Sequence, residues 1–127
     1  MFAIEVQGVF CAAHQLRLAD GTLESVHGHN WQVTVRVEAG ELDEIDTVMD
    51  FHPLEAALGA ICRGWNNSHL NEIEPFKSTI NPSAERVAEQ IGRLLMPTVV
   101  QATRGRARVA EVRVTEAPNC VALWRAD

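Results

Sequence analysis

Three histidines, at positions 14, 27 and 29, lie close together near the start of the chain. His27 and His29 are two residues apart where a strand-like segment begins, so their side chains point to the same side of that strand. His14 follows an earlier strand-like segment, which an antiparallel ladder would place beside this pair. Three imidazoles with one open coordination position are typical of a catalytic zinc site. We therefore predict that His14, His27 and His29 bind one Zn²⁺.

The spacing alone leaves other interpretations of these residues. A His-x-His pair also occurs as two ordinary surface histidines. A cupin-type metal site would need a glutamate a few residues further along the strand, and residues 32–35 are Gln, Val, Thr and Val, which exclude it. Cys11 precedes His14 by three residues, and an odd offset in a strand places it on the opposite face. We expect Cys11 to be a buried structural cysteine and not a ligand.

The elements that must position these histidines are four strands and two helices. Period-two alternation or helical spacing of apolar residues defines six segments, which are residues 2–9, 31–38, 53–64, 81–97, 108–115 and 120–125. The order strand, strand, helix, helix, strand, strand predicts a four-stranded antiparallel sheet with two helices on one face. We expect this α+β fold to form a single domain over residues 1–127.

Local signals refine these elements. A bulge is expected near Gly8 in the first strand, and Asp50 is expected to cap the first helix. Asn81 should cap the second helix, with Pro82 at its first position and Pro97 ending it. Nothing in the chain covers the second face of the sheet, so we expect other subunits to cover it in a homo-oligomer.

Composition limits the classes of function. The chain has 127 residues, 46% of them apolar, so it can form a core without a structural metal. The net charge is −6 and the densest basic stretch, Arg104 to Arg108, is typical of a solvated turn, which argues against nucleic-acid binding. No signal peptide and no membrane span of ~20 apolar residues is visible. Three widely spaced cysteines predict a reducing compartment, so we expect a cytoplasmic protein.

Five motifs, in chain order, resemble those of the 6-pyruvoyl-tetrahydropterin synthase / 6-carboxytetrahydropterin synthase family. They are Phe10-Cys11-Ala12-Ala13-His14, His27-Gly28-His29-Asn30-Trp31, Val48-Met49-Asp50-Phe51, Asn81-Pro82-Ser83-Ala84-Glu85 and Val112-Arg113-Val114-Thr115-Glu116. The resemblance implies the tunnelling fold, in which trimers close their sheets into a barrel and two trimers stack into a hexamer. It also implies zinc on the three histidines and pterin sites between subunits.

The resemblance further implies that Glu116 holds the pterin. A pterin presents a ring N–H and an amino group side by side, and a carboxylate accepts both as a fork. Taken alone, without the resemblance, Glu116 would be interpreted as a turn-side glutamate at the end of a strand. Ser83 occupies the place of the family's threonine, where it either contacts the pterin or caps a helix.

The chain departs from the family at the catalytic cysteine, since Gly21, Thr22 and Leu23 stand where that cysteine is expected. Glu24-Ser25-Val26-His27-Gly28-His29 instead resembles a third class of the family, in which glutamate replaces the cysteine. Those relatives are associated with trimming the side chain of dihydroneopterin triphosphate to a hydroxymethyl group. We predict that Glu24 is the general acid/base.

A second departure concerns the family's Asp-His proton relay. Asn66 and Asn67 stand in its place and neither titrates, so His69 either substitutes for it or is an ordinary surface histidine. Two functions remain open. The first is a zinc-dependent lyase acting on the side chain of 7,8-dihydroneopterin triphosphate or a close relative, in queuosine, folate or biopterin synthesis. The second is a non-catalytic or repurposed zinc- and pterin-binding member of the family.

Overall fold

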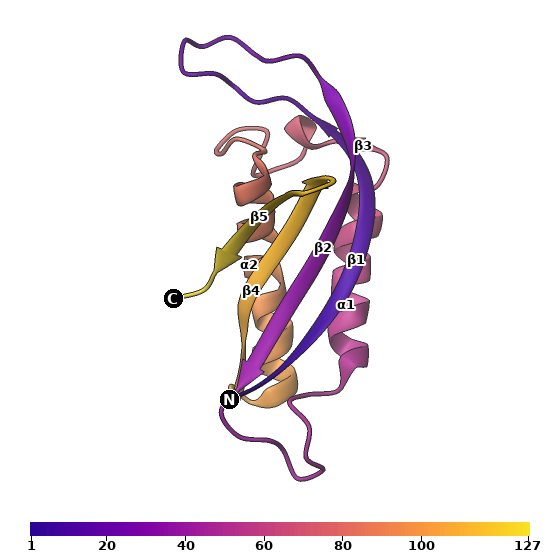
Figure 1. Cartoon of the computed structure of the whole chain (residues 1–127), viewed down its shortest axis with the longest axis vertical. Helices are drawn as coiled ribbons and strands as arrows, with labels where there is room; N and C mark the ends of the chain where they lie inside the picture. Colours follow the sequence, from indigo (N-terminus) through magenta and orange to yellow (C-terminus); the bar gives the residue numbers. More distant parts are fainter.

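One twisted sheet forms the front of the molecule and two helices lie behind it, both against the same face (Figure 1). The computed structural model describes all 127 residues. The elements are β1 (Phe2–His14), β2 (His27–Ala39), α1 (Phe51–Trp65), β3 (Ser68–His69), the 3-10 helix η1 (Leu70–Glu72), α2 (Ala84–Thr103), β4 (Ala107–Ala117) and β5 (Cys120–Arg125). The predicted α+β arrangement is confirmed.

The sheet has five strands in the order β3-β1-β2-β4-β5, so the predicted count of four is wrong. The additional strand, β3, runs parallel to the end of β1. It follows the end of α1, where Asn66 Oδ1 accepts the Cys11 N–H at 2.8 Å and the Asn67 N–H donates to the Cys11 carbonyl at 2.6 Å. A two-residue strand is too short to show alternation, and therefore only these tertiary contacts reveal it.

The β1–β2 ladder pairs every residue from Phe2↔Ala39 to His14↔His27 without a register shift. The bulge expected near Gly8 is therefore absent, and the register shifts fall between β2 and β4 and between β4 and β5. Gly8 is instead a point of close contact with α1, because a Cβ at this position would lie 2.9 Å from Cys62 Sγ. The missing side chain lets this helix approach the strand closely.

The helix ends differ from expectation in α2 and agree with it in α1. Asp50 caps α1 by accepting the backbone N–H of His52 at 3.0 Å. Ser83, and not Asn81, caps α2, since its Oγ accepts the Arg86 N–H at 3.2 Å. The helix-cap interpretation of Ser83 is thus confirmed, and the helix begins two residues later than the Asn81-Pro82 signal indicated.

Pro97 lies inside α2 and does not end it. A proline inside a helix removes the hydrogen bond to the carbonyl four residues earlier, here that of Arg93, and costs about 3 kcal/mol. Pro97 and Arg93 are both exposed, so water can reach this carbonyl and the cost is smaller. Beyond Pro97 the buried stripe of Val87, Ile91 and Leu95 continues through Val99. Burying one such side chain contributes about 1.5–3 kcal/mol, which offsets most or all of that penalty.

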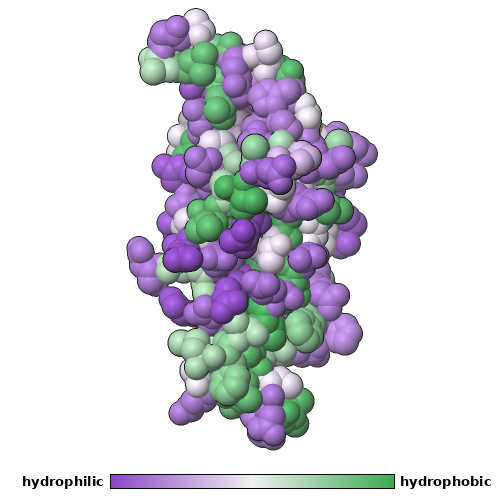
Figure 2. Space-filling view, viewed as in Figure 1, coloured by the Kyte–Doolittle hydropathy of each residue, from purple (hydrophilic) through white to green (hydrophobic).

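The two faces of the sheet differ in polarity. The face against the helices carries the fully buried Trp31, Val33, Val35 and Val37 of β2. The opposite face carries Gln32, Thr34, Arg36 and Glu38 from the same strand, and the surface seen in Figure 2 is mostly hydrophilic over its middle. Three exposed apolar side chains, Val9, Val121 and Leu123, lie on the same face in β1 and β5.

Cys11 lies on this open face, as its offset from His14 predicted, but it is exposed. The prediction that Cys11 is buried is wrong, because no element of the chain covers that side of β1. None of the helices has the length and hydropathy that crossing a bilayer requires.

Candidate metal centre

The three histidines gather where β1 ends and β2 begins. The antiparallel ladder pairs His14 directly with His27 and places His29 opposite Ala12. Their rings lie 4.6–5.2 Å from centroid to centroid, in edge-to-face orientations. The local strand pairing that the sequence predicted therefore brings these residues together.

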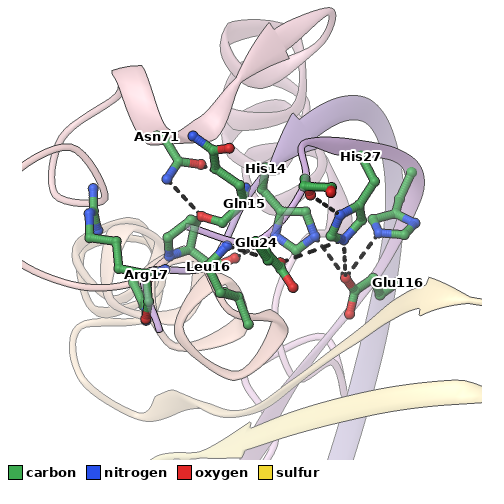
Figure 3. A network of polar contacts seen from close by, with 12 residues as sticks. His14, Gln15, Leu16, Arg17, Glu24, His27, Asn71 and Glu116 are labelled. Carbon is green, nitrogen blue, oxygen red and sulfur yellow. Dashed lines mark hydrogen bonds and ion pairs between the residues drawn. The ribbon is translucent and has the colours of Figure 1, made fainter. Parts of the chain in front are cut away.

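Glu116 reaches the same point from β4 (Figure 3). Its Oε1 lies 2.8 Å from His14 Nε2, 3.0 Å from His29 Nε2 and 3.9 Å from His27 Nε2. The β2–β4 ladder begins at Gln32↔Thr115, and the register shift between Thr115 and Ala117 falls at Glu116. That bulge turns the carboxylate toward the histidines.

Backbone carbonyls set the orientation of two of the rings. The Nδ1–H of His14 donates to the Pro82 carbonyl at 2.7 Å, and the Nδ1–H of His27 donates to the Ser25 carbonyl at 2.9 Å. A carbonyl only accepts, so each Nδ1 must carry the proton and each Nε2 is left with a free lone pair. This arrangement is the one that orients histidine ligands at metal sites.

Burial favours the neutral form of His29, which is the form that a metal requires. It lowers the pKa of His29 below its ordinary value, a shift that the Glu116 carboxylate opposes only in part. The Nε2 atoms of His14 and His29 are buried without a hydrogen bond of acceptable geometry, although Glu116 lies within 3.0 Å. Buried nitrogens without a hydrogen bond are unfavourable, and coordination to a divalent cation would satisfy both of them.

The four ligand atoms lie within 4.8 Å of one another, so His14, His27, His29 and Glu116 could hold a metal ion. Ligands about 2.0–2.2 Å from a tetrahedral Zn²⁺ would be separated by roughly 3.3–3.6 Å, which is close to the spacing here. The residues present therefore fit a metal with nitrogen and oxygen ligands.

Glu24 lies at the border of this cluster. Its Oε1 accepts the Leu16 N–H at 2.9 Å and is 3.9 Å from His27 Nε2. The side chain is 31% exposed, so it faces both the histidines and solvent. Both Glu24 and Glu116 thus join the predicted ligands in one place.

The other two predicted site residues make different contacts. His69 Nδ1 accepts the Asn71 N–H at 3.2 Å and caps η1, with no contact to the cluster. Ser83 caps α2. A cleft of about 360 Å³ lies beside Glu116, lined by Ala84, Glu85, Glu116, Cys120, Val121 and Ala122.

Sequence reasoning missed the residues that fasten the segment after His14. Asn71 and Asn81 each make two hydrogen bonds to its backbone, and Pro82 orients His14. The Asn81-Pro82 dipeptide is the only local sign of these residues, and its pattern predicts a helix cap instead of a contact with the segment after His14.

An α+β domain with an imidazole and carboxylate centre at one end of its sheet is the class that the fold and site define. The family model for 6-pyruvoyl tetrahydropterin synthase matches residues 3–127. The chain therefore belongs to this family and has the tunnelling fold.

Individual relatives agree with this assignment. A 6-carboxy-5,6,7,8-tetrahydropterin synthase of Helicobacter pylori is 26% identical over an alignment that is 131 positions long, gaps included, and that covers 87% of this chain and 66% of the relative. The chain thus spans slightly less than two thirds of the length of that relative.

Two solved structures share the fold. The Caenorhabditis elegans 6-pyruvoyl tetrahydropterin synthase has a TM-score of 0.76 at 20% identity, covering 99% of this chain and 96% of its own. A variant of the Plasmodium vivax enzyme has a TM-score of 0.75 at 18% identity, covering 100% and 99%, and carries cysteine in place of a glutamate described as a catalytic residue.

Proposed function

We propose that this protein is a zinc-dependent pterin synthase that acts as a lyase on the side chain of 7,8-dihydroneopterin triphosphate or a close relative. The observation that carries the proposal is the convergence of three histidine Nε2 atoms on one carboxylate, with two of the rings oriented by backbone carbonyls. Free, unpaired cysteines accord with action in the cytoplasm.

His14, His27 and His29 would hold the zinc ion. When bound, zinc polarises the hydroxyl or carbonyl oxygens of the substrate side chain. Analysis of protein purified without added zinc should find one equivalent per chain. Less than a tenth of an equivalent, or full retention after loss of one histidine, would contradict this assignment.

Glu24 would move the proton. Its Oε1 accepts the Leu16 N–H and lies 3.9 Å from His27 Nε2, so the carboxylate would take up or release a proton beside the histidines. The glutamate described as a catalytic residue in the Plasmodium vivax enzyme supports this role. The Leu16 contact also holds the carboxylate still, so the base is already in place before substrate arrives.

Glu116 would accept the two parallel N–H groups of the pterin, and Ser83 would lie at the edge of that site. The cleft beside Glu116 provides space for a small ring system. His69 would act as a proton relay only if it gave up its cap on η1.

The test of the function is turnover on 7,8-dihydroneopterin triphosphate with identification of the product. A carbon–carbon or carbon–oxygen cleavage product that depends on Glu24 is the expected result. Tight pterin and zinc binding with no turnover on any dihydropterin would refute the lyase.

That outcome would support the second candidate, a non-catalytic or repurposed zinc- and pterin-binding protein. Asn66 and Asn67 favour it, because both residues stand at the family's relay position and form hydrogen bonds to the backbone of Cys11 in β1. His69 favours it too, since its ring caps η1.

A further inference from the structure

We propose that Asn81 is a positioning residue for His14, acting through the carbonyl of Pro82. The inference rests on the proposed role of His14 as a metal ligand. Asn81 is bound to the segment after His14 by both polar atoms of its side chain. Its Oδ1 accepts the Arg17 N–H at 2.8 Å, and its Nδ2 donates to the Arg17 carbonyl at 2.9 Å. The amide therefore pairs with Arg17 as a neighbouring strand would.

The side chain of Arg17 also bonds to the segment that precedes α2. Nη2 donates to the carbonyls of Phe76 at 2.6 Å and Lys77 at 3.0 Å, and Nη1 donates to that of Ile80 at 3.2 Å. Backbone and guanidinium thus hold the chain before α2 from two sides. Charge-assisted bonds of this kind are about twice as strong as neutral ones.

The next residue along this chain is Pro82, whose carbonyl takes the His14 Nδ1–H at 2.7 Å. Proline fixes its own φ and restricts the residue before it, so ψ of Pro82 is the one freely rotating backbone dihedral between the Asn81–Pro82 peptide and the Pro82 carbonyl. Holding Asn81 in place therefore limits where that carbonyl can lie. His14 is 2% exposed, and therefore water has little access to replace a displaced acceptor. Loosening Asn81 should leave Nδ1 without a partner and the Nε2 lone pair no longer fixed toward the metal.

Asn71 offers a matched control. It clamps Gln15 in the same manner, with Oδ1 accepting the Gln15 N–H at 3.0 Å and Nδ2 donating to its carbonyl at 2.8 Å. Asn71 therefore makes the same two bonds to the same segment, but its neighbours supply no carbonyl to a histidine. Figure 3 shows the Asn71–Gln15 contact on the side of His14 away from Glu116.

The experiment compares Asn81→Ala, Asn81→Asp and Asn71→Ala by zinc affinity in chelator competition, urea unfolding, and the ¹⁵N resonances of the His14 ring. Both alanine variants should lose similar stability. Asn81→Ala should also weaken zinc binding by about 10–100-fold and shift the His14 Nδ1 signal, whereas Asn71→Ala should change affinity less than about threefold. Asn81→Asp, which keeps the acceptor for the Arg17 N–H, should be intermediate.

Equal loss of zinc affinity in Asn81→Ala and Asn71→Ala, or an unchanged His14 signal in Asn81→Ala, would overturn the inference. If Asn81→Ala does not fold, Arg17→Met removes the guanidinium bonds and should shift the same signal. The ring resonances are also measured in metal-free protein. Absence of zinc binding by the wild type would therefore defeat the proposed function, while the His14–Pro82 contact would still be tested.

Discussion

The candidate metal centre depends on which nitrogen of each imidazole carries its proton. His14 and His27 present Nε2 because carbonyls of Pro82 and Ser25 take their Nδ1 protons. Glu116 then brings a carboxylate to within 3.9 Å of all three Nε2 atoms. Each of the two glutamates at the site can be tested by a change that preserves size and removes charge.

Glu116→Gln should weaken pterin binding by about 5–150-fold. The amide keeps the shape but turns one acceptor into a donor facing a donor, a mismatch worth about 1–3 kcal/mol. Titration of a dihydropterin followed by fluorescence measures it, with zinc content as the control. An unchanged dissociation constant would remove Glu116 from the pterin site, and a parallel loss of zinc would make it a metal ligand.

Glu24→Gln should lower turnover by roughly 10²–10⁴-fold while zinc and pterin still bind. Glutamine retains the acceptor for the Leu16 N–H, so the loop should keep its shape. Single-turnover kinetics with product analysis measures the loss. Glu24→Asp, which keeps the carboxylate on a shorter stem, is the matched comparison and should retain more activity. Full activity in Glu24→Gln would end the acid/base assignment.

At the scale of elements, α2 must lie close to the edge strand β5. Gly92 of α2 faces Trp124 of β5 so closely that a Cβ would stand 2.2 Å from Cζ3 of the indole. Arg93 covers the same ring at 5.8 Å. This contact holds β5, which pairs with β4, against the helix.

Gly92→Ala should destabilise the fold even though alanine is the better helix former. Overpacking costs about 1–3 kcal/mol, whereas the propensity gain is about 1 kcal/mol. Gly64→Ala in α1, where a Cβ would meet nothing within 4 Å, should instead be neutral or stabilising. Urea unfolding followed by tryptophan fluorescence compares the two variants. Equal changes in the free energy of unfolding would show that Trp124 moves aside at no cost in stability.

At the scale of the whole molecule, both outer edges of the sheet carry unpaired backbone groups. β5 is the last strand on one side, and β3 covers β1 only at Ala12 and Ala13. Such edges are usually closed by pairing. These edges are therefore a physical reason to expect subunit contacts.

We predict a hexamer of two stacked trimers, in which β1 of one subunit pairs with β5 of the next. Light scattering should give a mass about six times that of the 14.0 kDa chain. Dilution into the low micromolar range should leave it unchanged, since barrel closure removes every edge at once. A stable monomer at that concentration would exclude this assembly.

Removal of the metal should leave a folded protein. The hydrophobic core of 26 buried residues is large enough to hold the fold without a metal, so chelation should preserve the far-ultraviolet circular dichroism spectrum. The melting temperature should fall, because a ligand at 1,000 times its Kd contributes about 4 kcal/mol to the native state. Collapse of the spectrum on chelation would identify the metal as a structural one.

Many of the structural elements of this protein can be predicted from short-range patterns in its sequence. Alternation located β2, helical spacing located α1, and Asp50 marked where that helix begins. The proximity of the three histidines could also be predicted, because β1 and β2 are adjacent in the chain and pair in simple register. Patterns of period two and 3.6 are local, and a sequence displays them directly.

Tertiary contacts decided the remainder. α2 continues through Pro97 because burial of the following turns outweighs a local signal to stop. Asn81 clamps Arg17 instead of capping a helix, and the Pro82 carbonyl orients His14 across 68 residues of sequence. β3 pairs with the end of β1 directly after the contacts that Asn66 and Asn67 make with Cys11. Each of these contacts joins distant segments, and their relative placement depends on how the helices pack on the sheet, which no local pattern encodes.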